Sequence, residues 1–403
     1  MKPIFTLLLV SCALMLSNAL LVNASASANT SSTPQSLLQA DSYSLETIAS
    51  GLQYPKALTV LPDDSILIVE RDGFLTVVLN DGNSIRHGLN LPALYTKGQG
   101  GVLDVLVVED KLLLSYSKGD EEANALAVVL VSFSAEQGVS GFTPIFEVKD
   151  KKDTPVHYGG KLLALKSGGF LVTVGDGFDY REQAQVVNSQ LGKIIGFKLN
   201  GEPLDAPPFS DNPYVYSIGH RNPQGLVYGS DGNVYQHEHG PDGGDELNLI
   251  TRGNNYGWPV VTLGKDYSGA NISPFTEYQG MINPLVNWTP SIAPSSMVLY
   301  RQPAPDIPAL FSHLEGAFLI TSLKAKTLFA VLPQPSKDAQ QLSKQNNSKE
   351  TNSEESNRFT VQPIVEELNT RLRDVEVNSK GEILVITDGD NANLIRVTAP
   401  KQQ

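Results

Sequence analysis

The sequence predicts an all-β protein, and in particular a β-propeller. Short apolar runs of strand length alternate with turn residues from residue 44 onward, and helical periodicity is almost absent. One unit recurs, a polar turn that leads into an apolar strand, at Pro62–Val69, Ser167–Val174, Ser230–Tyr235 and Ser379–Ile386. Repetition of such a unit along one chain is typical of a propeller, and this length suits about five to seven four-stranded blades.

Length and composition allow either one large domain or two ordinary ones. The chain has 403 residues, 41% of them hydrophobic, which is enough to bury a large core. A pair of β-sandwiches is the alternative to a propeller. Because no linker separates two compact halves, we expect a single propeller over residues 44–400.

The N-terminal residues have the features of a secretory signal peptide. Met1-Lys2 precedes an apolar run over residues 4–22, and a run of small residues follows over residues 23–28. We therefore expect a signal peptide over residues 1–28, a polar leader over 29–43, and a mature protein in the bacterial periplasm without stable membrane insertion. The alternative, an anchor helix, lacks a charged stop-transfer flank.

Cys12 is the only cysteine and lies inside the predicted signal peptide. The mature protein would then have neither a disulfide nor a thiol nucleophile. Leu9-Val10-Ser11 before Cys12 leaves a lipoprotein as an alternative, although the apolar run continues well beyond this position.

The net charge of the chain limits the classes of binding partner. The formal net charge is −13, which argues against nucleic acid as a partner because phosphate binding needs clustered Lys and Arg.

Residues 333–357 are rich in Ser, Asn, Gln, Lys and Glu and nearly devoid of large apolar residues. This segment is expected to be a surface insertion between strands, with a partner-binding tail as the alternative.

A predicted hairpin carries the most informative polar residues. Gly225–Tyr228 and Asn233–His237 are two short strands joined by the turn Gly229–Gly232. A hairpin returns the chain to its starting point. The cationic run before it should therefore lie near the acidic, glycine-rich run from Glu238 to Glu246 that follows it.

The acidic run offers oxygen ligands of the kind that hard cations prefer. Asp242, Asp245 and Glu246 stand beside glycines that allow the backbone to turn its carbonyls outward. Calcium takes six to eight such oxygens, whereas zinc prefers His and Cys. The spacing does not match an EF-hand loop, so a solvated acidic turn remains the alternative at this point.

Several motifs, taken in order, resemble the soluble quinoprotein aldose sugar dehydrogenases of the glucose/sorbosone dehydrogenase family. They are Gln99–Asp104, His157–Lys161, Gly219–Gly225, Glu238–Asn248, Asn255–Trp258, Tyr267–Gly269, Trp288–Ser295, Ser322–Lys324 and Arg371–Asp374. Each is weak alone, but their order between Gly51 and Val397 is specific.

The resemblance implies a six-bladed propeller that binds pyrroloquinoline quinone (PQQ) on its axial face beside calcium. The implied cofactor contacts are Gln99, Arg221, Asn222, Tyr267, Ser322, Lys324, Arg371 and Arg373. PQQ carries three carboxylates and an orthoquinone, so it requires several fixed cations even in an acidic protein. For Arg371 and Arg373, an exposed salt-bridged strand edge is the alternative.

The resemblance also implies two calcium sites. The backbone carbonyls of Gly240 and Pro241 would hold the calcium of the cofactor. Asp245, Glu246 and Tyr256 would bind a second, structural ion, the last through its carbonyl. This implication favours a metal loop over an acidic turn.

His157 matches the catalytic base of the family. A neutral imidazole can take the proton from the anomeric hydroxyl of a sugar near pH 7, while hydride leaves the same carbon. Arg221 would stabilise the developing oxyanion. The implied reaction converts an aldose into a lactone and passes electrons to an external acceptor. Without the other motifs, a solvated loop histidine would be the simpler interpretation of His157.

Three positions depart from the family pattern. Lys161 stands where Arg is usual, Val156 precedes the base where some relatives carry a substrate-contacting Asp, and Ser296 replaces a usual Gly. These departures put in doubt which sugar is the substrate more than whether the cofactor binds.

Two other functions compete with the dehydrogenase. A calcium-dependent propeller hydrolase of the lactonase kind would need no quinone. A non-catalytic propeller that binds sugars or peptides would have no use for four convergent cations. The expected partners are an aldose and an electron acceptor, and the protein is expected to be a monomer or a homodimer.

Overall fold

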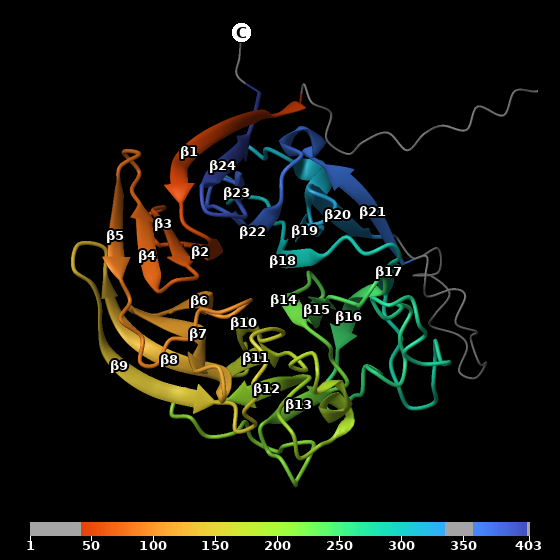
Figure 1. Cartoon of the computed structure of the whole chain (residues 1–403). Helices are drawn as coiled ribbons and strands as arrows, with labels where there is room; N and C mark the ends of the chain where they lie inside the picture. The colour runs from red at the N-terminus through yellow and green to blue at the C-terminus, as the bar shows by residue number, and fades with distance from the viewer. Residues whose placement is uncertain (1–41, 335–357, 401–403) are drawn as a thin grey trace, which may run out of the picture. The chain divides into compact units, whose positions relative to one another are not determined.

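Six four-stranded antiparallel sheets are arranged as blades around a central axis in the computed structural model (Figure 1). The structure describes residues 42–334 and 358–400. The predicted signal peptide with Cys12, nearly all of the polar leader, and all but the first two residues of the 333–357 segment lie outside the described residues. The prediction of an all-β, six-bladed propeller is confirmed, whereas the proposed domain limits stay a prediction.

Blades 1 to 5 each consist of four consecutive strands. Blade 1 contains β2 (Pro55–Val60), β3 (Ile66–Glu70), β4 (Phe74–Val78) and β5 (Ser84–Gly88), and blade 2 contains β6 (Val102–Val108), β7 (Lys111–Gly119), β8 (Asn124–Ser134) and β9 (Gly138–Glu147). Blade 3 contains β10 (Gly159–Ala164), β11 (Phe170–Val174), β12 (Lys193–Phe197) and β13 (Val215–Ile218). Blade 4 contains β14 (Pro223–Tyr228), β15 (Val234–Glu238), β16 (Asp245–Ile250) and β17 (Val286–Trp288), and blade 5 contains β18 (Pro294–Leu299), β19 (Phe318–Ser322), β20 (Leu328–Pro333) and β21 (Phe359–Ile364).

Blade 6 joins the two ends of the described chain. It contains β22 (Leu372–Val377), β23 (Ile383–Thr387), β24 (Ala392–Thr398) and, on its outer side, β1 (Ser44–Leu52). β1 pairs with β24 in an antiparallel register that sets Ser44 opposite Thr398. The first described strand thus completes the last blade, and the ring closes through hydrogen bonds between the two chain ends.

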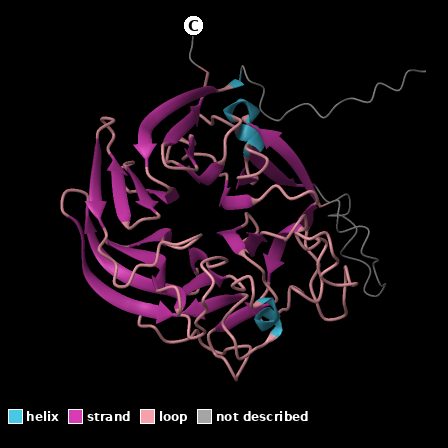
Figure 2. Ribbon diagram, viewed as in Figure 1, coloured by secondary structure: helices cyan, strands magenta, loops and turns pink. Residues whose placement is uncertain are grey.

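Helical structure is limited to short turns in the described residues (Figure 2). The 3-10 helices are η2 (Arg181–Gln185), η3 (Ser312–Leu314) and η5 (Glu366–Leu368). None of the helices within the described ranges has the length and apolar character needed to cross a membrane.

The hydrophobic core is divided among the interfaces between neighbouring blades. Each of six buried clusters joins side chains from two adjacent sheets; Leu67 of blade 1, for example, packs in the same cluster as Leu114 of blade 2. The second strands are covered on both faces, and every residue of β3, β11, β15 and β23 is buried. This burial explains why the recurrent turn-and-strand units are apolar without alternation, since all four of them form second strands.

The first strand of each blade lines the axis, and these strands pack against one another in sequence around the ring (Figure 1). All six begin at the same end of the ring, which we call the axial face. Loops that enter a first strand, and loops between second and third strands, meet there. Most first strands carry a register shift beside their first residue, as in β14 between Pro223 and Gly225 and in β22 between Leu372 and Asp374. Such bulges turn side chains near the rim away from the regular sheet direction.

Candidate active site

His157 lies in the loop that enters β10 and is held from two sides. Its backbone amide donates to Oε1 of Gln99 over 2.8 Å. Its Nδ1 lies 2.7 Å from Oδ1 of Asp176, and Oδ2 of the same carboxylate accepts a hydrogen bond of 2.8 Å from Nε1 of Trp258. Asp176 therefore fixes the orientation of the imidazole, and Trp258 fixes Asp176.

The environment of His157 favours a neutral ring. The side chain is only 5% exposed, and burial lowers the pKa of the imidazole below its ordinary value, although the hydrogen bond with Asp176 opposes this shift. Arg221 lowers the pKa further. With Nδ1–H donating to the carboxylate, the free lone pair is on Nε2, as a general base requires.

Arg221 enters the same face from the loop before β14. Nη1 donates to the carbonyl oxygen of Gly240 over 2.7 Å, and Nη2 lies 3.4 Å from the hydroxyl of Tyr267. Its backbone amide donates to Oε2 of Glu238 over 2.7 Å. β14 and β15 form the predicted antiparallel hairpin. The expectation that the residues before and after this hairpin lie together is confirmed.

The loop between β15 and β16 folds back on itself at Gly240. A Cβ at this position would lie 2.2 Å from the carbonyl oxygen of Gly243. Another close approach occurs at Gly175, where a Cβ would lie 2.1 Å from the carbonyl oxygen of His157. Only glycine permits these backbone approaches, the first within the β15–β16 loop of blade 4 and the second between two loops of blade 3.

A second group of cations lies at the start of β22. Arg371 and Arg373 both donate to Asp388, over 2.8 and 2.7 Å. Burial would raise the pKa of the Asp388 carboxyl, but the two guanidinium groups lower it. Arg371 also approaches the carbonyl oxygen of Leu323, at 3.5 Å, and so reaches the loop that carries the exposed Lys324.

His239 connects the two groups of cations. Its half-buried imidazole has Nε2 2.7 Å from the carbonyl oxygen of Pro294, at the start of β18. Burial lowers its pKa to about 3, and the charges of Arg221 and Arg373 act in the same direction. Both arginines are therefore close enough to influence one imidazole ring, although they come from blades 4 and 6.

The side chains of Ser322 and Asn222 form hydrogen bonds within the loops. The hydroxyl of Ser322 donates to the carbonyl oxygen of Ile292 over 2.5 Å. Oδ1 of Asn222 accepts hydrogen bonds from the amide of Gly159 and from Gln224, at 3.3 and 3.1 Å. These two predicted cofactor contacts stay predictions.

Two carboxylates, the first buried and the second half-buried, face each other next to the Gly240 loop. Glu238 of β15 and Glu246 of β16 are direct cross-strand partners, so their side chains share one face of the sheet. Burial raises the pKa of both carboxyls, and the charge of Glu238 raises that of Glu246 further. A cation between them would remove this repulsion, so the pair fits the donor chemistry of calcium.

The predicted calcium ligands do not form a side-chain cluster. Tyr256 is buried with its ring against His220, and its hydroxyl donates to the carbonyl oxygen of Leu249. Within residues 42–334 and 358–400, no group of three or more His, Cys, Asp or Glu side chains is arranged to hold a metal. Carbonyl ligands, as predicted for Gly240, Pro241 and Tyr256, would have to complete either site.

Asp245 holds the shape of this loop. Its carboxylate accepts four hydrogen bonds, from the amide of Gly240, the hydroxyl of Ser291 and the amides of Ile292 and Ala293. Both oxygens are thus occupied by donors from blade 4 and the following connection. The role of Asp245 as a calcium ligand stays a prediction, beside this observed role in the loop.

Several residues that support the site were not singled out from the sequence. A signal for some of them exists, because the second strands of four blades end in or just before an acid: Glu70, Asp176, Glu238 and Asp388. Second strands run toward the axial face, so these acids reach it. Each then binds a partner there or nearby; Glu70, for example, pairs with Arg86 at 2.6 Å.

Lys56 of β2 is another cation that the sequence did not single out. It occupies the bulge after Pro55, and the charges that act on it are those of Arg373, Asp388 and Arg71. Burial lowers the pKa of its ammonium to about 7, and Arg373 contributes in the same direction. Lys161, which departs from the family pattern, lies instead between acids of the axis-lining strands, with Nζ 3.1 Å from Asp104.

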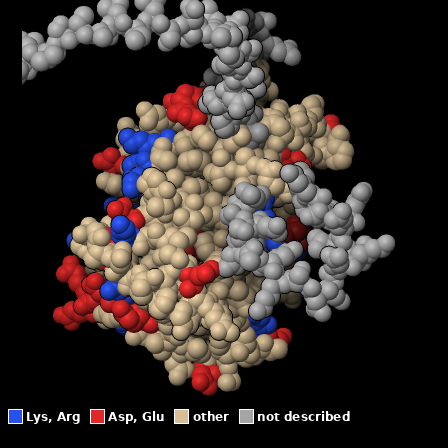
Figure 3. All heavy atoms as spheres, turned by 90° about the vertical axis from the view of Figure 1, so that its right-hand side faces the viewer, with Lys and Arg blue, Asp and Glu red and all other residues tan. Residues whose placement is uncertain are grey.

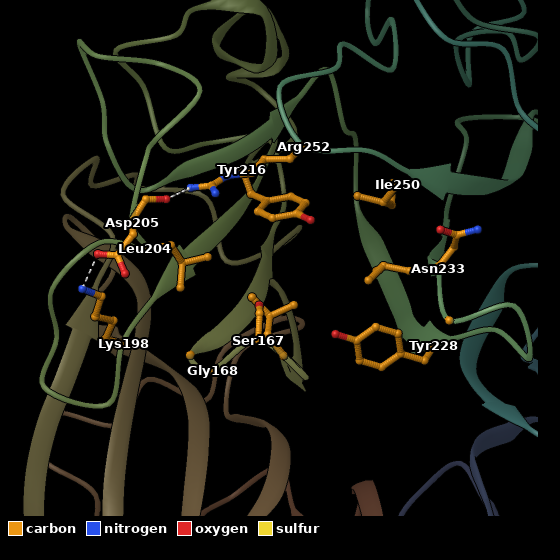
Figure 4. A pocket seen from close by; sticks show the side chains of 14 residues that line it. Ser167, Gly168, Lys198, Leu204, Asp205, Tyr216, Tyr228, Asn233, Ile250 and Arg252 are labelled. Carbon is orange, nitrogen blue, oxygen red and sulfur yellow. Dashed lines mark hydrogen bonds and ion pairs between the residues drawn. The ribbon is translucent and has the colours of Figure 1, made fainter.

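A pocket of about 720 Å³ lies away from this site (Figure 4). The turns after β10 and β14 line it, at the opposite ends of those strands from His157 and Arg221. Tyr216 and Tyr228 stand at its sides, and Asp205 pairs with Lys198 at 2.7 Å at its edge. None of the predicted site residues lines this pocket.

The surface charges are mixed. In the side view of Figure 3, acidic and basic side chains lie next to each other along one edge, and most of the visible face carries neither. Among the described residues visible on this face, Lys and Arg form no continuous basic surface of the kind that a nucleic-acid backbone requires.

Fold and site define a class of protein: a six-bladed propeller with a histidine–carboxylate pair and convergent cations on one axial face. Residues 52–396 match the family model described as Glucose / Sorbosone dehydrogenase. The chain therefore belongs to this family of sugar dehydrogenases.

Named relatives agree with this assignment. The chain is 30% identical over 372 residues to aldose sugar dehydrogenase YliI of Escherichia coli (strain K12), with 88% of this chain and 92% of that protein covered. It is 29% identical over 290 residues to quinoprotein glucose dehydrogenase B of Acinetobacter calcoaceticus, with 63% and 61% covered. The crystal structure of the soluble aldose sugar dehydrogenase from Escherichia coli in the apo-form superposes with a TM-score of 0.78 at 28% identity, covering 89% of this chain and all (100%) of that chain.

Proposed function

We propose that this protein is a quinoprotein oxidoreductase that oxidises the anomeric carbon of aldoses to lactones, with PQQ and calcium as cofactors and an external electron acceptor. The observation that carries the proposal is the geometry of His157, whose Nδ1 is held by Asp176 on the same face as Arg221, Arg371 and Arg373. Two relatives, an aldose sugar dehydrogenase and a quinoprotein glucose dehydrogenase, support it.

The charges at the axial face fit PQQ. Arg221, Lys324, Arg371 and Arg373 would hold its carboxylates, and the buried Nε of Arg221 has no hydrogen-bond partner within the described residues. Gln99, Asn222, Tyr267 and Ser322 would supply further contacts. When bound, PQQ supplies an orthoquinone that accepts hydride, and calcium makes that quinone more electrophilic.

Calcium fits the neighbouring loop. The carbonyls of Gly240 and Pro241 would hold the ion of the cofactor. Glu246 and the carbonyl of Tyr256, with Asp245, are proposed for the second ion, and the facing carboxylate of Glu238 is a further candidate ligand.

In the proposed reaction, the residues of the chain move one proton and hold one developing charge. Nε2 of His157 takes the proton of the anomeric hydroxyl, while Asp176 accepts the Nδ1–H bond and stabilises the imidazolium that forms. Trp258 keeps Asp176 in place. The guanidinium of Arg221 stabilises negative charge near Tyr267, and the near-complete burial of His157 excludes water from the base.

Reconstitution tests the proposed function directly. Purified protein freed of cofactor and metal should reduce a dye with aldoses only after both PQQ and calcium are added. Absence of dye reduction with every aldose of a panel, although PQQ is shown to bind, would contradict the proposal. Lactone hydrolysis with calcium alone would favour a hydrolase, and sugar binding without turnover would favour a binding propeller.

Glu246→Gln tests the second calcium site. Loss of one ligand charge should lower the melting temperature in calcium and make it insensitive to a chelator, because an ion that binds only the folded state stabilises it. Asp242→Asn is the matched control, since Asp242 is an exposed acid of the same loop, and it should keep the chelator response. A parental calcium shift in Glu246→Gln would mean that this carboxylate binds no ion.

A further inference from the structure

Two exposed aromatic rings lie beside the nearly buried base. Phe178 is 42% exposed and Tyr267 is 65% exposed, whereas His157 is 5% exposed. The Phe178 ring meets the imidazole edge-on at 5.2 Å, and its centroid lies 6.4 Å from that of Tyr267 with the rings inclined by only 22°. The two rings thus form one exposed aromatic wall in contact with the imidazole.

The position of Phe178 is tied to the base. Its amide donates over 2.8 Å to Oδ1 of Asp176, the oxygen that also lies 2.7 Å from Nδ1 of His157. The residue has φ 70°, a left-handed conformation that bulky side chains rarely adopt. The fold therefore keeps a large apolar ring in a strained, half-exposed position next to the catalytic histidine, where no core packing requires it.

The chemistry of this wall matches one face of a sugar. A pyranose whose hydroxyls are equatorial presents only C–H groups on its two faces, and these pack well against aromatic rings, whereas an axial hydroxyl would leave a polar group against them. We propose that Phe178, together with Tyr267, binds the C–H face of glucose-like pyranoses and directs their anomeric hydroxyl to His157. This inference rests on the proposed function and assigns Phe178 a role in selecting the sugar.

Phe178→Ala is the direct test, in protein loaded with PQQ and calcium. The KM for glucose should rise about 10-fold, the scale of a lost aromatic contact, with little change in kcat. The KM for allose, galactose and mannose, each with one axial hydroxyl, should change less, so discrimination should fall. Phe178→Tyr should retain the parental KM, Phe178→Leu should be intermediate, and the dissociation constant of PQQ should stay the same in all three.

Phe275→Ala is the matched control. Phe275 is 45% exposed and its ring meets that of Tyr278 edge-on, with centroids 5.2 Å apart, so it has an exposure and an aromatic contact like those of Phe178 but its ring contact is not with His157. An equal rise of KM in this control, or an unchanged KM for glucose in both Phe178→Ala and Phe178→Leu, would overturn the inference.

Two measurements on cofactor-free protein do not depend on turnover. The NMR titration of His157 should move toward the ordinary pKa of 6.5 in Phe178→Ala, because the ring no longer keeps water from the imidazole, while the charges of Asp176, Arg221 and Lys152 that act on it remain. Calorimetry should detect glucose binding that Phe178→Ala weakens. If the parental protein, loaded with PQQ and calcium, oxidises no aldose, the proposed function fails. The sugar site is then judged by calorimetry alone. Equal glucose binding in parent and Phe178→Ala, or no glucose binding in either, overturns the proposed sugar site.

Discussion

His157→Gln should lower kcat by about 10²- to 10⁴-fold, the usual contribution of a general base. Glutamine keeps much of the size of the side chain and can still donate to Asp176, but it cannot accept a proton at neutral pH. Because the cofactor would be held by cations elsewhere on the axial face, the affinity for PQQ should remain close to that of the parent. The measurement is the rate of dye reduction at saturating PQQ, beside a PQQ titration of each protein.

Two further variants serve as comparisons for His157→Gln. His87→Gln changes a histidine of the outer strand β5, whose ring contacts the carbonyl oxygen of Ala135, and should leave the rate unchanged. Arg221→Lys keeps the charge but loses the planar fork that reaches Gly240 and Tyr267, so it should weaken PQQ binding as well as turnover. A parental rate in saturated His157→Gln would place the base at another residue.

Asp245→Ala should destabilise the folded protein by about 3 kcal/mol or more, because it strips partners from three buried or partly buried amides and one hydroxyl. The effect should appear in urea unfolding both with calcium and with a chelator, since the lost hydrogen bonds belong to the protein itself. Loss of stability confined to calcium-containing buffer would instead identify Asp245 as a metal ligand.

Asp242→Ala provides the comparison for this variant. Asp242 lies three residues earlier in the same loop, but its side chain is exposed. Its contribution to the loop is a backbone pairing with Lys265, which alanine retains. The free energy of unfolding should therefore stay close to the parental value, and an equal loss in both variants would contradict the account of Asp245.

The regular part of the fold could be predicted from local patterns. The recurrent polar turn and apolar strand identify second strands because those strands are covered on both faces and lose their alternation. The hairpin of β14 and β15 could be predicted from its turn residues, and Gly232 has the positive φ, 82°, that such turns favour. The number of blades came from the family resemblance, since strand patterns alone allowed about five to seven.

The site depends on contacts that no local pattern records. Trp258 and His157 meet on Asp176 although Trp258 is 82 residues from that acid. The long connection between β16 and β17 brings Tyr267 to Arg221, and part of its course is fixed by pairing between Asp242 and Lys265. This connection has no hydrophobic periodicity, so its return to the axial face depends on tertiary contacts and cannot be predicted from the local sequence.

Asp245 is a second residue whose contacts cannot be predicted from a local sequence pattern. In the sequence it stands in an acidic, glycine-rich run and resembles an ion ligand. Its hydrogen-bond donors at Ser291, Ile292 and Ala293 lie 46 to 48 residues further along the chain, beyond the range of any spacing rule. Residue type indicates that the side chain offers two oxygens, but only the structure identifies the groups that donate hydrogen bonds to them.

The pairing of β1 with β24 also sets an order of events during synthesis of the protein. A nascent chain that ends before Ala392 has no partner for β1, so it carries open sheet edges on both sides of the gap, where other chains can add. The proposed cofactor residues from Gln99 to Arg373 enter from four different blades and come into register only around a closed ring. PQQ would therefore have to enter after translation is complete, and chains interrupted late should aggregate rather than accumulate as partly active enzyme.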